Sequence, residues 1–312
     1  MRICVIGGNG KTGMYLLPML VEEGHEVICV TRGNHGYYRK DEAFSRVREV
    51  HLTRGTPDFE KEIAALDADV VVDTICFTPE DMLRLIREIQ GRVRHYIVTG
   101  SVWIHGHGTA LPYTEEEDRH PFGDYGIRKL AMAETLHALY REEGFPGTIV
   151  HPGHIIAPGV DPVISPQGNP DIDSFRRLKN GEELLLPNAG LETVHHVHAR
   201  DVAGIMDAVI RKGSITFGEE FHAVSKRAMS LRGYAESTAA LFGQEAHLTY
   251  LPFAEFRKAV GEKKALSTLD HISHSPSASI EKTERVLGYR VCTTMDAVRE
   301  HLTAIGMLEA EK

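Results

Sequence analysis

The chain has 312 residues, of which 42% are hydrophobic and 25% are charged, and this composition is typical of a globular protein with one large domain or two closely joined ones. Its formal net charge of −9 opposes broad contact with a phosphate backbone, so we expect no nucleic-acid partner. The sequence starts with the apolar run RICVIGG, without a charged leader, and holds no stretch long enough to span a bilayer. We therefore expect a cytoplasmic protein with no membrane partner.

The four cysteines, Cys4, Cys29, Cys76 and Cys292, lie singly and far apart in the chain. The first three fall in apolar runs of the kind that form strands. We therefore predict buried free thiols rather than a disulfide framework.

Strand-length apolar runs alternate with helix-length segments through the first half of the chain. The runs are rich in β-branched residues and cover 2–6, 26–31, 49–53, 69–75, 95–100 and 147–153. The helical segments between them cover 11–23, 58–66, 79–90 and 124–143. This alternation predicts an α/β fold with a doubly wound parallel (Rossmann) sheet covered by helices on both faces. Pro18 lies inside the first helical segment and should kink or shorten that helix.

The second half differs in composition. Residues 153–192 are rich in Pro, Gly and Asn, with one helical piece in DIDSFRRLKNG, and shorter mixed elements follow. We expect a dinucleotide-binding domain over 1–152, to which 193–224 return. A smaller mixed α/β domain that binds the substrate would then consist of 153–192 and 225–312.

The segment CVIGGNGKTGMYL places three glycines between the first strand and the first helix. Gly7 permits a tight turn, Gly10 lets a pyrophosphate approach the backbone, and Gly13 lets the helix pack closely. The start of the helix offers free N–H groups and the positive end of its dipole to phosphates. The pattern predicts a dinucleotide site, to which we also assign Asn9, Lys11 and Thr12.

The end of the second strand bears on the choice between NAD and NADP. An acidic residue there would bind a ribose 2′-hydroxyl, but this chain has Thr31 and Arg32, with Lys11 as a second cation in the glycine loop. These residues favour NADP as the cofactor, with NAD as the alternative. Arg32 as an ordinary solvated surface charge stays open.

Tyr125 and Lys129 are four residues apart in a helical segment, so their side chains share one face. Ser101 lies upstream, at the end of the fifth strand. Together with the glycine loop, the motifs DVVVDTICFTPEDM, TGSVWIHG, LPYTEEE, YGIRK, HPGHIIAPG and VHHVHARDVAG occur in the order of a known family. The chain resembles the short-chain dehydrogenase/reductase superfamily, and in particular its extended or atypical NAD-dependent epimerase/dehydratase branch.

The resemblance implies roles for these residues. Tyr125 would be the catalytic acid–base group, and Ser101 would bond to the reacting oxygen of the substrate. A free tyrosine has a pKa near 10, and the cation of Lys129 would favour the phenolate and lower that value. Lys129 would also bind the nicotinamide ribose, and Pro152 in HPGHIIAPG is assigned to the cofactor site.

Departures from the family pattern bear on the substrate. Sugar-nucleotide dehydratases carry an acidic pair where this chain has Val102 and Trp103. Enzymes that resemble UDP-galactose epimerase hold the diphosphate with an asparagine and an arginine, at positions where this chain has His154 and Val194. A smaller or less charged hydroxyl or carbonyl compound therefore competes with a sugar nucleotide.

Trp103, His105 and His154 are candidate substrate contacts. Trp103 would stack on a ring or fill a gap, and His105 would contact the substrate or be a structural, hydrogen-bonded histidine. We expect no metal site, because no cysteine or carboxylate accompanies the histidines of VHHVHA at a zinc spacing. His271 and His274 look like a pair in a loop.

The leading hypothesis is an NAD(P)-dependent oxidoreductase or epimerase that acts on a sugar-like small molecule. The sequence does not separate a reductase from an epimerase. The rival is a non-catalytic member of the same fold, either a redox sensor that binds NADP or a protein that resembles chloroplast stem-loop RNA-binding proteins. A homodimer is expected from the resemblance only.

Overall fold

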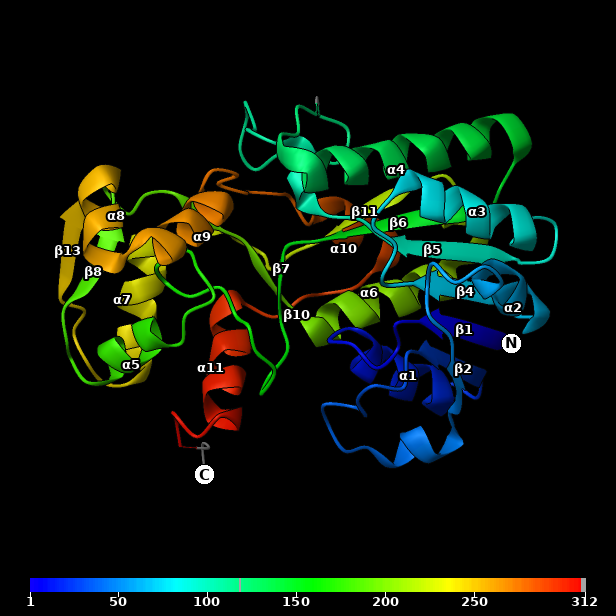
Figure 1. The fold of residues 1–312 in the computed structure, drawn as a ribbon, viewed down its shortest axis with the longest axis horizontal. Helices are drawn as coiled ribbons and strands as arrows, with labels where there is room; N and C mark the ends of the chain where they lie inside the picture. The colour runs from blue at the N-terminus through cyan, green and yellow to red at the C-terminus, as the bar shows by residue number, and fades with distance from the viewer. Residues whose placement is uncertain (118, 310–312) are drawn as a thin grey trace.

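The computed structural model describes residues 1–117 and 119–309. Its centre is a parallel seven-stranded sheet with the order β11-β6-β5-β4-β1-β2-β3 (Figure 1). The strands are β1 (Arg2–Ile6), β2 (Glu26–Thr31), β3 (Arg48–His51), β4 (Val70–Asp73), β5 (His95–Thr99), β6 (Gly147–Pro152) and β11 (Glu220–Ala223). This sheet confirms the predicted Rossmann-type fold. Strand β3 is an edge strand with three of its four residues exposed, whereas β11 at the opposite edge is buried.

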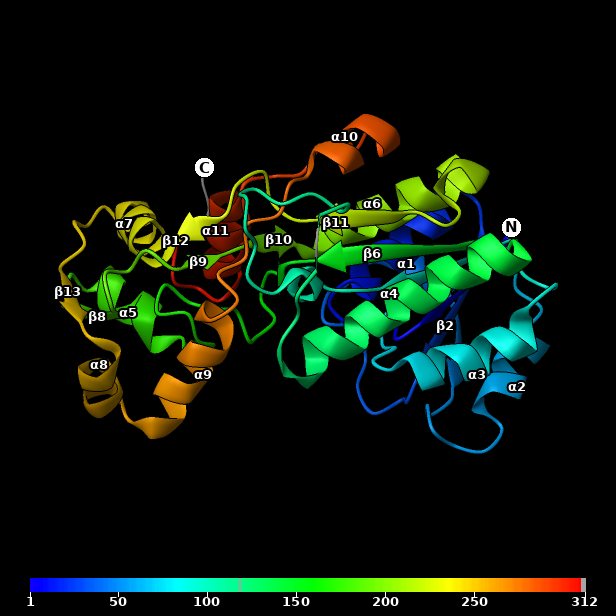
Figure 2. The same ribbon diagram turned by 90° about the horizontal axis from the view of Figure 1, so that it is seen from above.

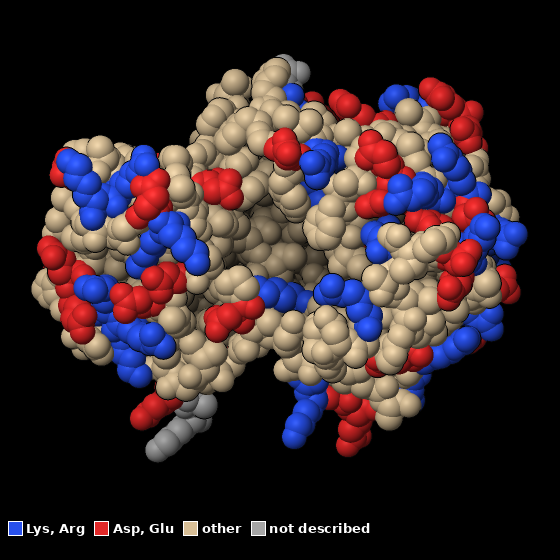
Figure 3. Space-filling model, in the orientation of Figure 1, with Lys and Arg blue, Asp and Glu red and all other residues tan. Residues whose placement is uncertain are grey.

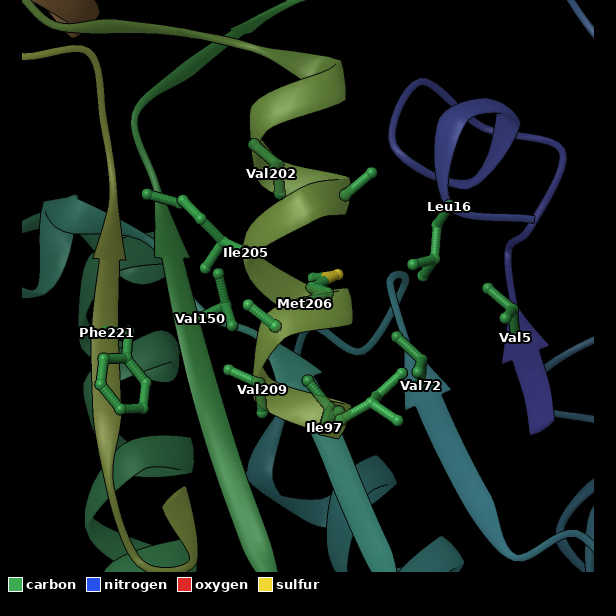
Figure 4. Close-up of a cluster of buried hydrophobic side chains, with 14 of the residues drawn as sticks. Val5, Leu16, Val72, Ile97, Val150, Val202, Ile205, Met206, Val209 and Phe221 are labelled. Carbon is green, nitrogen blue, oxygen red and sulfur yellow. The ribbon is translucent and has the colours of Figure 1, made fainter. Parts of the chain in front are cut away.

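Helices cover both faces of the sheet. One face carries α1 (Gly13–Glu22), α6 (Ala199–Lys212) and α10 (Glu281–Leu287), and the other carries α2 (Phe59–Ala65), α3 (Pro79–Ile89) and α4 (Gly123–Glu143). Alternate residues of β1 supply both cores: Val5 packs in the core under α1 and α6, and Cys4 packs in the core under α2, α3 and α4. Figure 4 shows part of the first core, where Met206 of α6 lies over Ile97.

Helix α1 does not end at Pro18, so the expected shortening does not occur. A proline inside a helix has no backbone N–H, so here the carbonyl of Met14, one turn earlier, lacks its usual helical donor. Pro18 itself is buried among the residues that α1 packs against the sheet.

A smaller lobe follows the sheet, on the left in Figure 1. It contains α5 (Asp173–Lys179), β8 (Leu184–Pro187), β9 (Thr193–Val194), β12 (Met229–Ser230), α7 (Leu231–Leu241), β13 (Leu248–Leu251), α8 (Phe253–Val260), α9 (Glu262–Ile272) and α11 (Thr294–Ala304). Its own hydrophobic core includes Phe175, Tyr234 and Leu302.

The chain crosses between the two lobes more than once. Strands β7 (His154–Ile156) and β10 (His196–His198) form a parallel pair between the lobes (Figure 2). Strand β11 then completes the large sheet, and α10 returns to pack on α6 and β11. The predicted domain division at residues 152, 193 and 224 stays a prediction. It assigns α10 to the smaller domain, although α10 packs on the large lobe.

The cysteines are free thiols: Cys4, Cys29 and Cys76 are buried, and Cys292 is half-buried. Among the described residues, the structure contains no helix with the length and apolar character that a membrane crossing requires.

Candidate active site

The glycine loop joins β1 to α1. Gly7 has a φ of +79°, and a Cβ atom there would lie 2.5 Å from Oγ1 of Thr74. A Cβ on Gly13 would lie 2.1 Å from the carbonyl oxygen of Gly8, so the close packing expected at this position is with the loop backbone. A Cβ on Gly10 would meet only the carbonyl oxygen of Gly7, at 3.2 Å. The loop is therefore tight at its two ends and open at its middle glycine.

A cavity of about 510 Å³ lies beside this loop, at the carboxyl ends of β1 and β2. Gly10 and Asn9 line it from the loop, and Arg32 and His35 line it from the segment after β2. The side-chain amide of Asn9 donates to the carbonyl of His35 at 2.9 Å and holds the two segments together. In doubly wound folds a dinucleotide binds at this edge of the sheet, so these residues fit the group that the sequence predicts.

The other loop residues assigned to the cofactor behave differently. The ammonium of Lys11 donates to the carbonyl of Pro162 at 2.6 Å, and Lys11 does not line the cavity. It is therefore directed away from the cation site predicted beside Arg32. Thr12 is buried, and its carbonyl accepts from Leu16 in the first turn of α1. Pro152 is buried at the carboxyl end of β6.

Arg54 also lines the cavity, which the sequence analysis did not anticipate. Its guanidinium bonds to the fully buried carboxylate of Asp73 at 2.5 Å and lies over the ring of Phe59. Its Nε and Nη1 atoms are buried without a hydrogen-bond partner. Such unpaired donors are costly, and they are available to a ligand in this cavity.

Ser101 lies close enough to Tyr125 that its side chain influences the pKa of the Tyr125 phenol. The Tyr125 ring lies edge-on to Trp103, with the ring centroids 5.7 Å apart. The backbone N–H of Trp103 donates to the Ser101 hydroxyl at 3.2 Å. Although 41% of the Tyr125 surface is exposed, partial burial raises the pKa of its phenol, and the nearby Ser101 side chain opposes this rise.

Lys129 lies under this pair and is only 2% exposed. Its ammonium donates to the carbonyls of Thr99, at 2.6 Å, and Cys76, at 2.7 Å, and lies 5.8 Å from the centroid of the Tyr125 ring. Burial lowers the pKa of Lys129 to about 8. Burial raises the pKa of the Tyr125 phenol in the chain itself, and the ammonium of Lys129 is bonded to two backbone carbonyls, so a lowering by this cation stays a prediction.

Ser101 is held by a network that joins three strands. Its backbone N–H donates to Nδ1 of His151, at 3.0 Å, and Nε2 of His151 lies 3.0 Å from a carboxylate oxygen of Glu220. The other carboxylate oxygen of Glu220 bonds to Arg119. Burial keeps the pKa of His151 well below its usual range, so the ring is neutral and Nε2–H is the donor to Glu220. No spacing in the sequence indicates this network, because its members come from distant segments.

His105 lies apart from the other candidate substrate contacts, Trp103 and His154. It is 1% exposed, its Nε2 lies 2.9 Å from Nε2 of His222, and its ring stacks on Tyr113. Nδ1 of His222 bonds to the carbonyl of Ser279 at 2.9 Å. The geometry fits the structural alternative for His105 rather than a substrate contact.

Trp103 instead lies at the centre of a cluster of rings. His274 stacks on it, with the centroids 3.8 Å apart and the planes 10° from parallel. Tyr125, His154 and His271 meet it edge-on, at centroid distances between 5.7 and 6.1 Å. His271 and His274 are therefore not an isolated pair in a loop, because their rings join the smaller lobe to Trp103, beside Tyr125.

His154 completes this side of the site. It pairs with His196 in the register of β7 and β10, and its ring centroid lies 5.5 Å from that of His196 and 5.3 Å from that of His271. His198, in contrast, caps α6 by accepting from the N–H of Arg200. Within the described residues, no three His, Cys, Asp or Glu side chains are placed to hold a metal ion.

The sequence pattern of the NAD dependent epimerase/dehydratase family matches residues 3–80 and 78–221, more than half of the chain. The chain belongs to this family. It is 27% identical over 253 residues to 2'-dehydrokanamycin reductase from Streptomyces kanamyceticus, which covers 81% of this chain and 70% of that protein. It is 26% identical over 301 residues to the chloroplast stem-loop binding protein of 41 kDa b from Arabidopsis thaliana, which covers 93% of this chain and 75% of that protein.

Solved structures show the same fold. UDP-glucose 4-epimerase from Thermotoga maritima, solved with UDP-glucose, has a TM-score of 0.72 and 20% identity, and the likeness covers 98% of both chains. UDP-glucuronic acid 4-epimerase from Bacillus cereus, in complex with UDP-glucuronic acid and NAD, has a TM-score of 0.73 and 16% identity and covers 98% of this chain and 100% of that one.

This family member has apolar side chains at two positions where the sequence departs from related enzymes: Val194, at a diphosphate-binding position, and Val102, at a position that is acidic in sugar-nucleotide dehydratases. Val194 is fully buried in β9, within the core of the smaller lobe. Val102 is 1% exposed and packs in the core of the large lobe. Neither side chain can bond to a phosphate or act as an acid, which agrees with the departures noted in the sequence.

Proposed function

We propose that this family member is an NAD(P)-dependent oxidoreductase or epimerase that acts at a secondary alcohol or carbonyl of a sugar-like small molecule. The observation that carries the proposal is that Ser101 and Tyr125 lie together against Trp103, one helical turn from the buried ammonium of Lys129. A phenol and a second hydroxyl that point to one place can hold a substrate oxygen and exchange a proton with it.

The protonation of Tyr125 favours the reductive direction. Because the pKa of the phenol is raised, Tyr125 keeps its proton at neutral pH and is ready to donate it to a carbonyl oxygen. Ser101 would donate to the same oxygen and orient it. The similarity to 2'-dehydrokanamycin reductase supports this direction, whereas the epimerase structures support the fold alone.

A bound nicotinamide would supply the hydride. In this chain the glycine loop and Arg54 would hold the dinucleotide, and Lys129 would bind a ribose hydroxyl. We propose NADP rather than NAD because Arg32 lines the cavity at the end of β2 together with Asn34 and His35. The carboxylate that lines the cavity in the described part of the chain, Asp81, comes from α3 and not from this end.

The test is NADPH-dependent reduction of a panel of keto sugars, and the loss of NADPH absorbance measures the rate. We expect Tyr125→Phe to lower the turnover number by about 10³-fold, because general acid–base catalysis contributes on this scale. The dissociation constant for NADPH should stay within about twofold of the original value, since the ring is retained. A Tyr125→Phe variant with near-normal turnover would refute the assignment. NADP⁺ that copurifies and survives dialysis would favour an epimerase over a reductase.

A second candidate function is stem-loop binding, which the similarity to the Arabidopsis protein over 93% of this chain favours. The net charge of −9 argues against it, as does the mixture of acidic and basic side chains on the face in Figure 3. An electrophoretic shift assay with an RNA stem-loop, set beside the reductase assay, separates the two functions.

We also propose a homodimer that buries the outer face of α4. Ile127 on this helix is 51% exposed. Analytical ultracentrifugation of the full chain checks this, and a monomer at all concentrations would exclude it.

A further inference from the structure

Four histidines form one side of the space next to Tyr125, and we name them the histidine wall: His154, His196, His271 and His274. They come from β7, β10, the last turn of α9 and the segment after α9. Figure 3 shows a hollow between the two lobes whose floor consists of residues other than Lys, Arg, Asp and Glu. The Rossmann lobe thus provides the acid–base pair, and the histidine wall provides a second, chemically different surface.

The histidine wall has unused hydrogen-bonding capacity. Both ring nitrogens of His154 are buried without a partner, as are Nδ1 of His196 and Nε2 of His274. Three other nitrogens are engaged: Nε2 of His196 bonds to the carbonyl of Ile164, Nδ1 of His274 to that of Asp270, and Nδ1 of His271 to that of Ser267. Buried polar atoms in folded proteins are almost always paired, so this cluster calls for a partner that the chain itself does not supply.

The charge around the wall restricts what that partner is. The electrostatic influences on His154 come from other imidazoles, and the carboxylate of Asp270 acts on His274. Burial lowers the pKa of His154, His196 and His274, so these rings are neutral at pH 7. A neutral imidazole offers one N–H donor and one nitrogen acceptor, which matches a hydroxyl group and does not neutralise a phosphate.

We infer that the histidine wall and Trp103 form a subsite for an uncharged hydroxylated ring, a sugar or cyclitol that carries no phosphate, and present it to Tyr125. The hydroxyls of the ring pair with the free nitrogens of His154, and the indole of Trp103 supplies apolar surface. This inference rests on the proposed function and names the substrate class for it. It differs from the UDP-sugars that are present in the structures of the two epimerases.

The experiment uses a built-in probe. Trp103 is the sole tryptophan among the 312 residues, so tryptophan emission reports directly on this cluster. The purified full chain, saturated with NADP⁺, is titrated at pH 7.5 with methyl glucoside, methyl galactoside, myo-inositol, kanamycin and UDP-glucose. We expect a saturable change in emission with at least one of the three uncharged probes, at a lower concentration than with UDP-glucose or kanamycin. Tighter saturation by UDP-glucose or by the cationic kanamycin would overturn the inference, and so would no saturable response to any uncharged probe.

The variant His154→Phe sharpens the result, because it keeps an aromatic ring and removes both nitrogens. We expect the dissociation constant for the responding probe to rise about tenfold, which corresponds to the loss of one or two neutral hydrogen bonds. The matched control is His107→Phe, because His107 stacks on Phe122 and has no ring contact with Trp103. Equal binding by His154→Phe and the original chain would overturn the inference.

This result is separable from that of the proposed function. If the inference fails alone, NADPH still binds and a keto substrate of another class is still reduced through Tyr125. If the proposed function fails, Tyr125→Phe has no effect on any NADPH-dependent turnover, whatever the probes do to Trp103.

Discussion

The two sides of the candidate site differ in how the chain builds them. Ser101, Tyr125 and Lys129 come from one stretch of about thirty residues, and a strand end, a loop and a helix fix their spacing. The histidine wall comes from separate segments between His154 and His274, which meet only because β7 pairs with β10 and α9 ends against Trp103. The first side is a local motif, and the second is a product of tertiary packing.

The two sides also differ in the chemistry that they can perform. The local side combines a phenol, a hydroxyl and an ammonium, so its members differ in protonation and can move a proton. On the packed side, burial keeps the imidazoles of His154, His196 and His274 neutral, so these three can bind hydroxyls but supply no charge. Acid should therefore affect the chain mainly through its buried imidazoles.

The largest predicted effect is a loss of stability in acid. Burial lowers the pKa of His95, His195 and His222 to about 4, and that of His196 to about 3. Each has a pKa near 6.5 in the unfolded chain, so below that pH the unfolded chain binds protons that the folded chain does not. The free energy of unfolding should fall by on the order of 8 kcal/mol between pH 8 and pH 5, which is comparable to the whole stability of a domain.

Urea unfolding followed by far-ultraviolet circular dichroism at several pH values measures this slope. His95→Gln should flatten the slope by about a quarter, since one of the four groups no longer takes up a proton. His247→Gln is the control, because His247 is exposed and is not one of the four. A free energy of unfolding that stays constant down to pH 5 would show that these imidazoles are protonated in the folded chain.

Much of the large lobe could be predicted from the sequence, for a physical reason. Strands such as 26–31 are short β-branched runs and α4 is a continuous run of helix-forming residues, so their structure is decided locally. The glycine loop and the pair Tyr125 and Lys129 follow from the same local rules. The fold is confirmed, whereas the catalytic roles of these residues stay predictions.

The rest depends on contacts that one sequence does not display. Arg54 enters the dinucleotide cavity because β3 ends next to β2, and His151 reaches Ser101 because β6 lies beside β5. Lys11 leaves its predicted place because the smaller lobe offers the carbonyl of Pro162. His274 stacks on Trp103 only once the smaller lobe has folded. In each case the neighbour is distant in the chain, and periodicity carries no information about it.

Two histidines that look alike in sequence should respond in opposite ways to the same substitution. His151 uses both ring nitrogens, so His151→Phe removes the partner of the Ser101 N–H and of one carboxylate oxygen of Glu220, whose other oxygen stays bonded to Arg119. We expect this variant to lose about 3 kcal/mol in the free energy of unfolding. His154 uses neither nitrogen, so His154→Phe should leave stability unchanged or raise it. Urea unfolding at pH 8 compares the two variants, and equal losses would show that ring size rather than hydrogen bonding decides.

The smallest predicted effect concerns the cavity beside the glycine loop, where Arg32 would bind the cofactor. Arg32 lines the dinucleotide cavity at the end of β2 and is exposed, so a ribose 2′-phosphate would gain a charged hydrogen bond there that remains partly screened by water. Arg32→Ala should therefore weaken NADPH binding about tenfold and leave NADH binding within about twofold, measured by isothermal titration calorimetry. Arg46→Ala is the matched control, because Arg46 is also exposed after β2 but does not line the cavity. Equal weakening for both cofactors would mean that Arg32 contacts a part that NAD and NADP share, and the preference for NADP would then have no support at this position.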